Sequence, residues 1–439
     1  VARPEWSDLL GDGDRQKLVE LLTRSKAAGA SDKLSRSALL VACIQPAPIE
    51  IIKLLIESGA PHSAADLSGL TPLMAAARLD FETAEPILTS LLKAGANLEA
   101  VDEIGRTCLL HSVLSKRPLT TKWLIEKGAA IERTTTDRQS VFSWSTGESS
   151  AWLQSIPKNA GLLALLNLED AFGRTPLAWS TWRRDPVGMS QLIRLGADPN
   201  QRFGEHQSTA LVLALSMQDS QKLTQALLQG GADANLASSK MTPPLVIAAS
   251  LNNLVAVKQI IAAGSVVSAS DLDGNTALMH AARLNSVETL KALLEANGPI
   301  DQVNKSGRTA LAHAALAGSA EAILLLLEAG ANAKARDSKG RSVMQLAQES
   351  GSRQAIEQLQ IVTSLDIHAA ARFEQWSVIH RLRELGANLN QRDSVGKTPL
   401  MIAATQDSQK GVRFLLEGFA DDSKLLPADP NIVDPQGFT

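Results

Sequence analysis

The sequence lacks tyrosine altogether, and aromatic residues of all kinds make up only 3% of its 439 residues. It has two cysteines, Cys43 and Cys108, and no Cys-x-x-Cys pair, so neither a disulfide framework nor a cysteine zinc site is predicted. There is also no large excess of positive or negative charge. The net charge of −3 excludes a strong overall field that would attract nucleic acid or an acidic membrane.

Long hydrophobic runs are also missing. The most apolar patch, Gly161 to Leu168 (GLLALLNL), is far too short to cross a bilayer, so we expect no membrane insertion. The start of the chain does not resemble a signal peptide, and because it begins at Val1 without Met, a removed leader stays open. The few cysteines favour a reducing compartment, so we expect an intracellular, cytoplasmic protein.

Sequence patterns of catalysis are absent as well. No Gly-rich phosphate loop occurs, and no histidine has a Ser, Cys or Asp partner at a spacing that suggests a catalytic triad. We therefore expect no catalysis in this segment, no cofactor and no bound metal.

What the sequence does contain is a repeat of about 33 residues. A short motif, TALMHAA at Thr276 and TALAHAA at Thr309, recurs along the chain. Its copies begin at Ser37, Thr71, Thr107, Ser140, Thr175, Thr209, Pro243, Thr276, Thr309, Ser342, Leu365 and Thr398.

When the copies are aligned, three further columns of equivalent residues recur with the same period. A Leu or Ile pair follows nine of these starts by about seventeen residues, as in Leu293-Leu294. A Gly-Ala-Asn or Gly-Ala-Asp follows that pair, as in Gly330-Ala331-Asn332, and Asp-x-x-Gly-x-Thr leads into the next start, as from Asp271 to Thr276.

Each column has a physical interpretation. Thr caps a first helix, and a Pro after it fits the first helical turn. The Leu pair marks a second helix with a buried apolar face, which Gly ends in a left-handed conformation. The Asp-x-x-Gly stretch forms a tight turn. Each repeat is thus a helical hairpin with a projecting turn, and because one hairpin cannot bury its own apolar face, hairpins must stack.

This pattern resembles the ankyrin repeat family over nearly the whole chain. We count thirteen helical hairpins, taking Ser7 to Leu22 as a degenerate first one. The resemblance implies an all-α, elongated and curved solenoid with β-hairpin-like fingers. It also implies that the function is binding, usually of proteins, on the concave face.

We expect one array over residues 1–361 and a second array or a continuation over 362–439, truncated before a further repeat. The step from Ser342 to Leu365 is only 23 residues, so either a finger is deleted or one array ends there. Repeats of the first array start near residues 4, 37, 71, 107, 140, 175, 209, 243, 276, 309 and 342. The repeat at 140 is degenerate, with Pro157 where its second helix should run, so that helix should be short or kinked.

Three histidines, His111, His280 and His313, occupy one column of the repeat. Metal binding is not expected, because side chains one repeat apart could barely converge on one ion. The column elsewhere holds Val, Leu, Ile and Trp, so we attribute it to packing rather than to chemistry.

Tryptophan is concentrated around the degenerate repeat, where five of the seven fall within sixty residues. Two interpretations stay open: these side chains fill a loosely packed stretch, or they form a patch that binds a partner, since Trp and Arg are enriched in binding hot spots. The candidate partner-binding residues are Trp144, Phe172, Trp179, Trp182, Arg183, Arg78, Leu79, Arg283, Arg372 and Phe373. Arg106, Arg174, Arg308 and Arg341, which follow a finger Gly, are interpreted as structural.

The sequence therefore predicts an interaction scaffold that binds a partner protein on its concave face and fingers. Two alternatives stay open: a structural subunit or spacer within a large assembly, and the targeting arm of an enzyme or effector whose catalytic part lies outside this chain.

Overall fold

A computed structural model describes residues 31, 34–145, 147–156, 160–238, 240–363, 367–384, 387–417, 428–435 and 437. The degenerate first repeat expected at Ser7 to Leu22, and Pro157, lie outside these residues. The chain divides into two compact units, Val1–Asp233 (unit 1) and Ala234–Thr439 (unit 2), and each is described by itself. A boundary between residues 361 and 362 stays a prediction.

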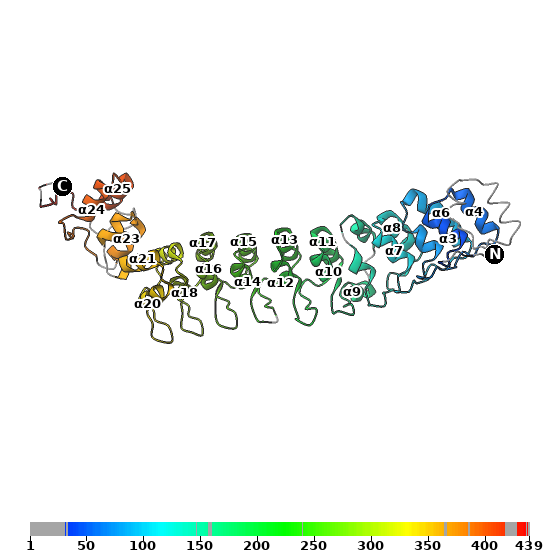
Figure 1. Cartoon of the computed structure of the whole chain (residues 1–439), viewed down its shortest axis with the longest axis horizontal. Coiled ribbons are helices and arrows are strands. Elements are labelled where there is room, and N and C mark those ends of the chain that lie inside the picture. Colours follow the sequence, from blue (N-terminus) through cyan, green and yellow to red (C-terminus); the bar gives the residue numbers. More distant parts are fainter. Residues whose placement is uncertain are drawn as a thin grey trace. The chain divides into compact units, whose positions relative to one another are not determined.

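Unit 1 is built from short helices joined in hairpins (Figure 1). In chain order they are α3 (Ala38–Ile44), α4 (Ile49–Glu57), α5 (Pro72–Ala76), α6 (Phe81–Lys93), α7 (Cys108–Leu114), α8 (Pro118–Glu126), the 3-10 helices η2 (Val141–Trp144) and η3 (Gly147–Ser155), α9 (Ala160–Leu166), α10 (Pro176–Trp182), α11 (Pro186–Leu195), α12 (Ala210–Leu215) and α13 (Gln221–Gln229).

Unit 2 continues the same pattern. Its helices are α14 (Pro244–Ser250), α15 (Leu254–Ala262), α16 (Ala277–Arg283), α17 (Val287–Glu295), α18 (Ala310–Ala317), α19 (Ala320–Glu328), α20 (Val343–Ser350), α21 (Arg353–Thr363), α22 (Ile367–Arg372), α23 (Trp376–Glu384), α24 (Pro399–Thr405) and α25 (Gln409–Glu417). No helix among the described residues is both long and apolar enough to pass through a membrane.

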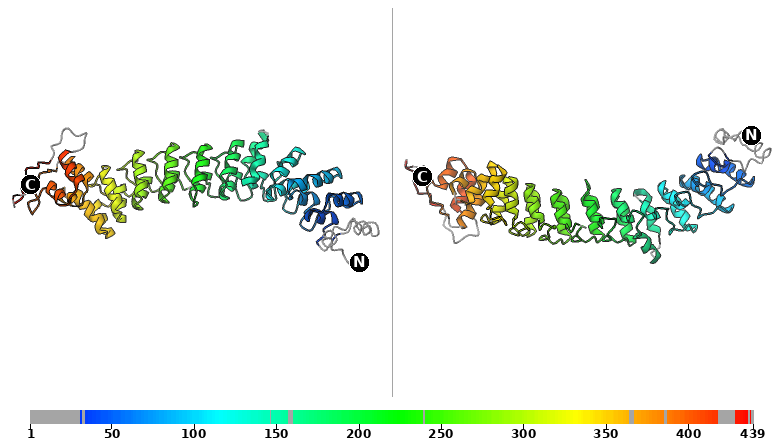
Figure 2. Two further views of the ribbon diagram at one scale, coloured as in Figure 1. Left: turned by 90° about the horizontal axis from the view of Figure 1, so that it is seen from above. Right: turned by 60° about the horizontal axis from the view of Figure 1, so that its bottom comes forward.

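The hairpins stack into two layers of helices. In unit 1, α3, α5, α7, η2, α10 and α12 pack in succession, while α4, α6, α8, η3, α11 and α13 form the second layer. In unit 2, α14, α16, α18 and α20 pack in the same way, and Figures 1 and 2 show these hairpins side by side with their fingers projecting from one edge. The Ala pairs of α16 and α18, Ala281-Ala282 and Ala314-Ala315, are fully buried where neighbouring helices approach.

The predicted caps are confirmed. In α10, Thr175 Oγ1 accepts a hydrogen bond from the Ala178 amide at 3.2 Å, and Pro176 occupies the first turn. Among the described residues, side-chain caps of this kind begin nine first helices, at Ser37, Thr71, Thr107, Thr175, Thr209, Thr276, Thr309, Ser342 and Thr398. Such a cap stabilises a helix by about 1 kcal/mol, which matters for helices of only two turns.

The fingers are tight turns joined to one another by single backbone hydrogen bonds. In unit 1, Glu103 N donates to Ser68 O at 3.1 Å and Gly204 N donates to Gly173 O at 2.7 Å. Gly69 shows why glycine is needed: its φ is +81°, and a Cβ there would lie 2.7 Å from Asp102 Cα of the next finger.

The degenerate repeat departs from the α-helical hairpin. η2 takes the first-helix position between α7 and α10, and η3 takes the second-helix position between α8 and α11. Both are 3-10 helices, and the α-helix that follows, α9, has only seven residues. The repeat therefore lacks a regular α-helical hairpin among the described residues, and the effect expected of Pro157 on its second helix stays a prediction.

The 23-residue step removes a finger. α21 ends at Thr363 and α22 begins at Ile367, which leaves no chain length for a projecting turn between them. α22 to α25 share a hydrophobic core that includes Trp376, whose ring stands 6.2 Å from that of Phe414.

Candidate functional site

The finger turns are built around one carboxylate. Asp170 Oδ1 accepts hydrogen bonds from the amides of Phe172 and Arg174, both at 2.9 Å. Its Oδ2 accepts from Arg174 Nε at 3.2 Å. Because Asp170 is buried, these bonds supply the partners that a buried charge needs, and they fix where Phe172 and Arg174 leave the backbone.

The histidine column carries a second tie from helix to finger. His111 Nε2 lies 3.1 Å from Asp102 Oδ2, and His280 Nε2 lies 3.0 Å from Asp271 Oδ2. Trp179 occupies the same column and donates from Nε1 to Asp170 Oδ2 at 3.0 Å. The prediction that packing alone sets this column is therefore wrong for these polar members, each of which bonds to the finger residue nine positions earlier.

The Asp102 site shows the electrostatics of this tie. Burial acts to raise the pKa of Asp102, but hydrogen bonds from Arg106 and the charges of Arg106 and His111 outweigh it, so the pKa lies below its usual value. Burial lowers the pKa of His111, and the Arg106 charge acts in the same direction. The pair thus favours a carboxylate facing a neutral imidazole.

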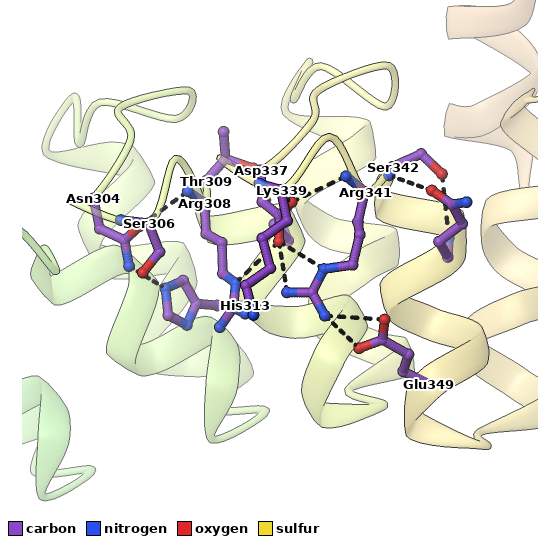
Figure 3. A network of polar contacts seen from close by, with 12 residues as sticks. Asn304, Ser306, Arg308, Thr309, His313, Asp337, Lys339, Arg341, Ser342 and Glu349 are labelled. Carbon is purple, nitrogen blue, oxygen red and sulfur yellow. Dashed lines mark hydrogen bonds and ion pairs between the residues drawn. The ribbon is translucent and has the colours of Figure 1, made fainter.

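In one finger of unit 2 the same position holds an amide, Asn304. Asn304 Nδ2 lies 3.1 Å from His313 Nε2, so the imidazole nitrogen accepts this hydrogen bond and is unprotonated. Burial, followed by the charge of Arg308, lowers the pKa of His313 to about 4. Figure 3 shows this pair beside Asp337, on which Arg308 and Arg341 converge. The contacts join neighbouring repeats, which is a structural role.

Three tryptophans of the degenerate region, Trp144, Trp179 and Trp182, are in contact with one another in unit 1. Trp179 stacks on Trp144 with ring centroids 6.2 Å apart, and Trp182 stands 5.9 Å from Trp179. Two guanidinium groups lie over these rings. We call this set the Trp–Arg cluster; it comprises Trp144, Phe172, Arg174, Trp179, Trp182 and Arg183.

Arg174 is the centre of the cluster. Its guanidinium carbon is 4.1 Å from the Trp179 ring centroid, 4.3 Å from that of Phe172 and 5.6 Å from that of Trp182. Each such cation–π contact contributes about 0.5–1 kcal/mol or more where water is excluded. Arg174 was interpreted from the sequence as structural, and it does brace Asp170, but it also orients three aromatic rings.

Arg183 lies on the other side of Trp179. Its guanidinium carbon is 4.6 Å from the ring centroids of both Trp144 and Trp179, and its Nη1 donates to Ser143 O. Burial lowers the pKa of Arg183, and the like charge of Arg174 adds to this, while Asp185 acts in the opposite direction. The cluster therefore holds two cationic groups close to one indole.

A cavity of about 260 Å³ lies beside the cluster. Trp182 and Arg174 form one wall, and Phe203 and Leu213 come from the next finger and helix. The antiparallel bridge between Phe203 and Ser208 holds that finger. Trp182 is 52% exposed and Phe172 is 60% exposed, so the apolar wall is open to a partner.

The other tryptophans of this stretch have different roles. Trp152 is 2% exposed and stacks on Phe142 with centroids 5.9 Å apart, so it belongs to the core of the degenerate repeat. Lys127 Nζ lies 5.3 Å from the Trp123 ring.

The remaining candidates lie apart from the cluster. Arg78 and Leu79 line a cavity of about 360 Å³ in unit 1. In unit 2, Arg283 lines a cavity of about 330 Å³. Arg372 Nη2 pairs with Asp393 Oδ2 at 2.7 Å, and Phe373 is 59% exposed. The structure thus brings together five of the ten candidates.

Two further observations concern metal and redox chemistry. Within the described ranges no group of three or more His, Cys, Asp or Glu side chains is placed to hold a metal ion. Cys43 and Cys108 are free and buried, and burial raises the pKa of both thiols to about 12, so they are unreactive core residues.

Comparison with known proteins identifies the repeat. A family model described as "Ankyrin repeats (3 copies)" matches residues 11–102, 39–135, 211–301, 245–337 and 296–366, and a single "Ankyrin repeat" model matches 395–435. Together these matches cover well over half of the chain.

Two curated proteins are similar to parts of the chain. An E3 ubiquitin-protein ligase, KEG, from Arabidopsis thaliana is 25% identical over 203 residues, which are 43% of this chain and 12% of that protein. The transient receptor potential cation channel subfamily A member 1 of Drosophila melanogaster is 28% identical over 193 residues, 41% of this chain and 16% of that protein. The matched region is thus a small part of each relative.

Among solved structures, the crystal structure of EF0377, an ankyrin repeat protein, is 24% identical. It aligns with 42% of this chain and 95% of its own, with a TM-score of 0.40.

Proposed function

Because the chain belongs to the ankyrin repeat family, we propose that it is a protein–protein interaction scaffold whose principal contact is the Trp–Arg cluster of unit 1. Ankyrin repeats are non-catalytic interaction modules, and we propose that no catalysis occurs in this segment. The partner is a protein, and nucleic acid, a metal and a cofactor have no part in the proposal.

One observation carries this proposal: two exposed aromatic rings, Phe172 and Trp182, stand over a braced arginine at the mouth of an apolar cavity. In the unbound protein, contact between an exposed aromatic ring and water is unfavourable in free energy. At interfaces, by contrast, Trp and Arg supply a large share of the binding energy. Among the described residues, the Trp182 side chain makes ring and cation–π contacts and no hydrogen bond, so no polar partner accounts for its exposure.

The scattered candidates are proposed as secondary contacts. Phe373 and Arg372 are exposed after the Ala pair of α22, and Arg283 is exposed at the end of α16. Arg78 and Leu79 hold the equivalent place after α5. Their positions resemble those of Trp182 and Arg183 at the end of α10, although they lack the aromatic stacking.

A second candidate function is the targeting arm of an enzyme or effector. It is favoured by the similarity to a ubiquitin ligase and a channel of which the matched region forms only 12% and 16%. In that case a catalytic or channel part lies outside this segment, and the repeats select what it acts on. A spacer within a large assembly is the third alternative.

The test is affinity capture with the tagged chain as wild type, Trp182→Ala and Val187→Ala. Val187 is 57% exposed on α11 and lies outside the cluster, so it is a matched surface control. We expect Trp182→Ala to lose at least one quantified partner that Val187→Ala retains. Equal recovery of every partner by all three proteins would favour the spacer.

A further inference from the structure

Arg183 differs from Arg174 and Arg372 in how its charge is matched. Arg174 pairs with Asp170 at 3.2 Å, and Arg372 pairs with Asp393 at 2.7 Å. For Arg183, no ion pair within 4.0 Å is found among the described residues; its nearest acidic influence, Asp185, is occupied by hydrogen bonds from the amides of Gly147 and Gly188.

The stacking of Arg183 leaves its binding edge available. A guanidinium has five N–H donors in one plane, and one of them is bonded to Ser143 O. Its guanidinium carbon lies over the rings of Trp144 and Trp179, and these ring contacts position the group without using its N–H donors. A held guanidinium with free donors matches a carboxylate, which it binds through two parallel hydrogen bonds.

The adjacent cavity selects a different kind of group. Trp182, Phe203 and Leu213 give it mainly apolar walls, although Glu205 and His206 also line it. Its volume of about 260 Å³ is smaller than the roughly 300–1,000 Å³ of typical small-molecule pockets. It therefore suits a single apolar side chain. An aliphatic or aromatic side chain inserted there would also cover the exposed face of Trp182.

The two features are close enough for one short segment. Arg174 forms part of the cavity wall and lies 4.1 Å from the Trp179 centroid, while Arg183 lies 4.6 Å from the same centroid. An extended chain advances about 3.3 Å per residue, so the apolar side chain and the carboxylate would be about two to four residues apart.

We propose that the Trp–Arg cluster binds an extended segment of a partner protein that places an apolar side chain in the cavity and a Glu or Asp carboxylate on Arg183. This inference rests on the proposed function and names its partner chemistry. The remaining positive charge of Arg183 and the apolar cavity both become matched only when such a segment is bound.

The experiment uses the whole chain and fluorescein-labelled nonapeptides of Gly and Ser carrying one Leu and one Glu at spacings of two, three and four. Companion peptides replace Glu with Gln, Leu with Ala, or Glu with phosphoserine. Affinity is measured by fluorescence anisotropy with wild type, Arg183→Gln and Lys222→Gln, because Lys222 is an exposed cation of α13 away from the cluster.

We expect one spacing to bind best and both the Glu→Gln and the Leu→Ala change in that peptide to weaken it about tenfold. Arg183→Gln should weaken the Glu peptide by a similar factor and leave the Gln peptide unchanged, whereas Lys222→Gln should change neither. The Glu→Gln comparison needs no protein variant, so a folding defect of Arg183→Gln would not obscure the result.

Other results would overturn the inference. Equal affinity for the Glu and Gln peptides, or tighter binding of the phosphoserine peptide, would show that a carboxylate is not the selected group. If these results came while Trp182→Ala still lost a captured partner, the partner chemistry would be wrong and the proposed function would stand. If Arg183→Gln bound the peptides as tightly as wild type and Trp182→Ala retained every captured partner, both the inference and the proposed function would be rejected.

Discussion

Replacing Asp102 with alanine should destabilise unit 1 by about 3–5 kcal/mol. Its side chain is 2% exposed. Oδ1 accepts from the amides of Ile104 at 3.1 Å and Arg106 at 2.8 Å, and Oδ2 binds Arg106 Nε at 2.7 Å and His111 Nε2 at 3.1 Å. One carboxylate therefore closes the turn and ties the finger to α7.

The magnitude follows from the groups left without partners. Each of the two part-buried amides costs about 1 kcal/mol when unpaired, and the buried His111 nitrogen costs about 1–3 kcal/mol. Arg106 is 32% exposed and can be hydrated again, so losing its ion pair adds less than about 1 kcal/mol.

Asp102→Asn is the matched control. The amide oxygen still accepts both backbone hydrogen bonds, and its nitrogen can donate to His111, as Asn304 does to His313 at 3.1 Å. Only the contact with Arg106 is lost, so we expect a cost of less than about 1 kcal/mol.

The assay is urea unfolding followed by circular dichroism, combined with hydrogen exchange of the amides of residues 104 and 106. Exchange is needed because repeat proteins open locally and a single unfolding free energy can miss the effect. Equal destabilisation by Asp102→Ala and Asp102→Asn, or a cost below about 1 kcal/mol for alanine, would refute the account of the finger carboxylate.

Three further predictions concern other parts of the fold. The pKa of His313 is about 4 in the folded state and near 6.5 in the unfolded state, so the unfolded chain binds more protons as pH falls from 6.5 to 4. The free energy of unfolding of unit 2 should therefore fall by up to about 3 kcal/mol over this range. In urea titrations at several pH values, His313→Leu should reduce this dependence on pH. Gly69 and Gly59 both have a φ of +81°, but a Cβ at Gly69 would lie 2.7 Å from Asp102 Cα, whereas a Cβ at Gly59 would meet open space. Thermal unfolding should therefore show a loss of stability of about 1 kcal/mol for Gly59→Ala and a clearly larger loss for Gly69→Ala. In urea unfolding, Trp152→Ala should lower the free energy of unfolding by about 3–5 kcal/mol, because Trp152 is buried, and Trp182→Ala by less than about 1 kcal/mol, because Trp182 is exposed. Similar losses for the two variants would contradict this difference in burial.

The fold was predictable because its signals are local. Thr175 caps α10 through a bond that spans three residues, and Gly196, which ends α11, has a φ of +118° that glycine adopts readily. A period of about 33 residues then implies stacking, because no single hairpin buries its apolar face. The bond from Trp179 to Asp170 was not predicted, since the motif alone does not show that His and Trp share one donor role.

The site was predictable only in part. Trp144, Phe172, Trp179, Trp182 and Arg183 were selected by residue type and repeat position, and the structure places them in contact. Whether a partner binds them stays a prediction.

The cavity and the second role of Arg174 were missed for a physical reason. Phe203 and Leu213 belong to the repeat after Trp182, and a gap between neighbouring repeats depends on side-chain volumes on both sides. Arg174 occupies a position interpreted as structural, and only the three rings around it reveal its contact with the cluster. The sequence signal for this contact was Phe172, an aromatic residue two positions after the finger residue Asp170.

Photo-cross-linking tests the central claim most directly. The chain would carry benzoylphenylalanine in place of Trp182 or, as the control, in place of Val187, which is similarly exposed on α11. If the Trp–Arg cluster is the partner-binding surface, irradiation of the captured complex should link the partner to position 182 and not to position 187. Cross-linking at position 187 alone, or at both positions equally, would contradict the account.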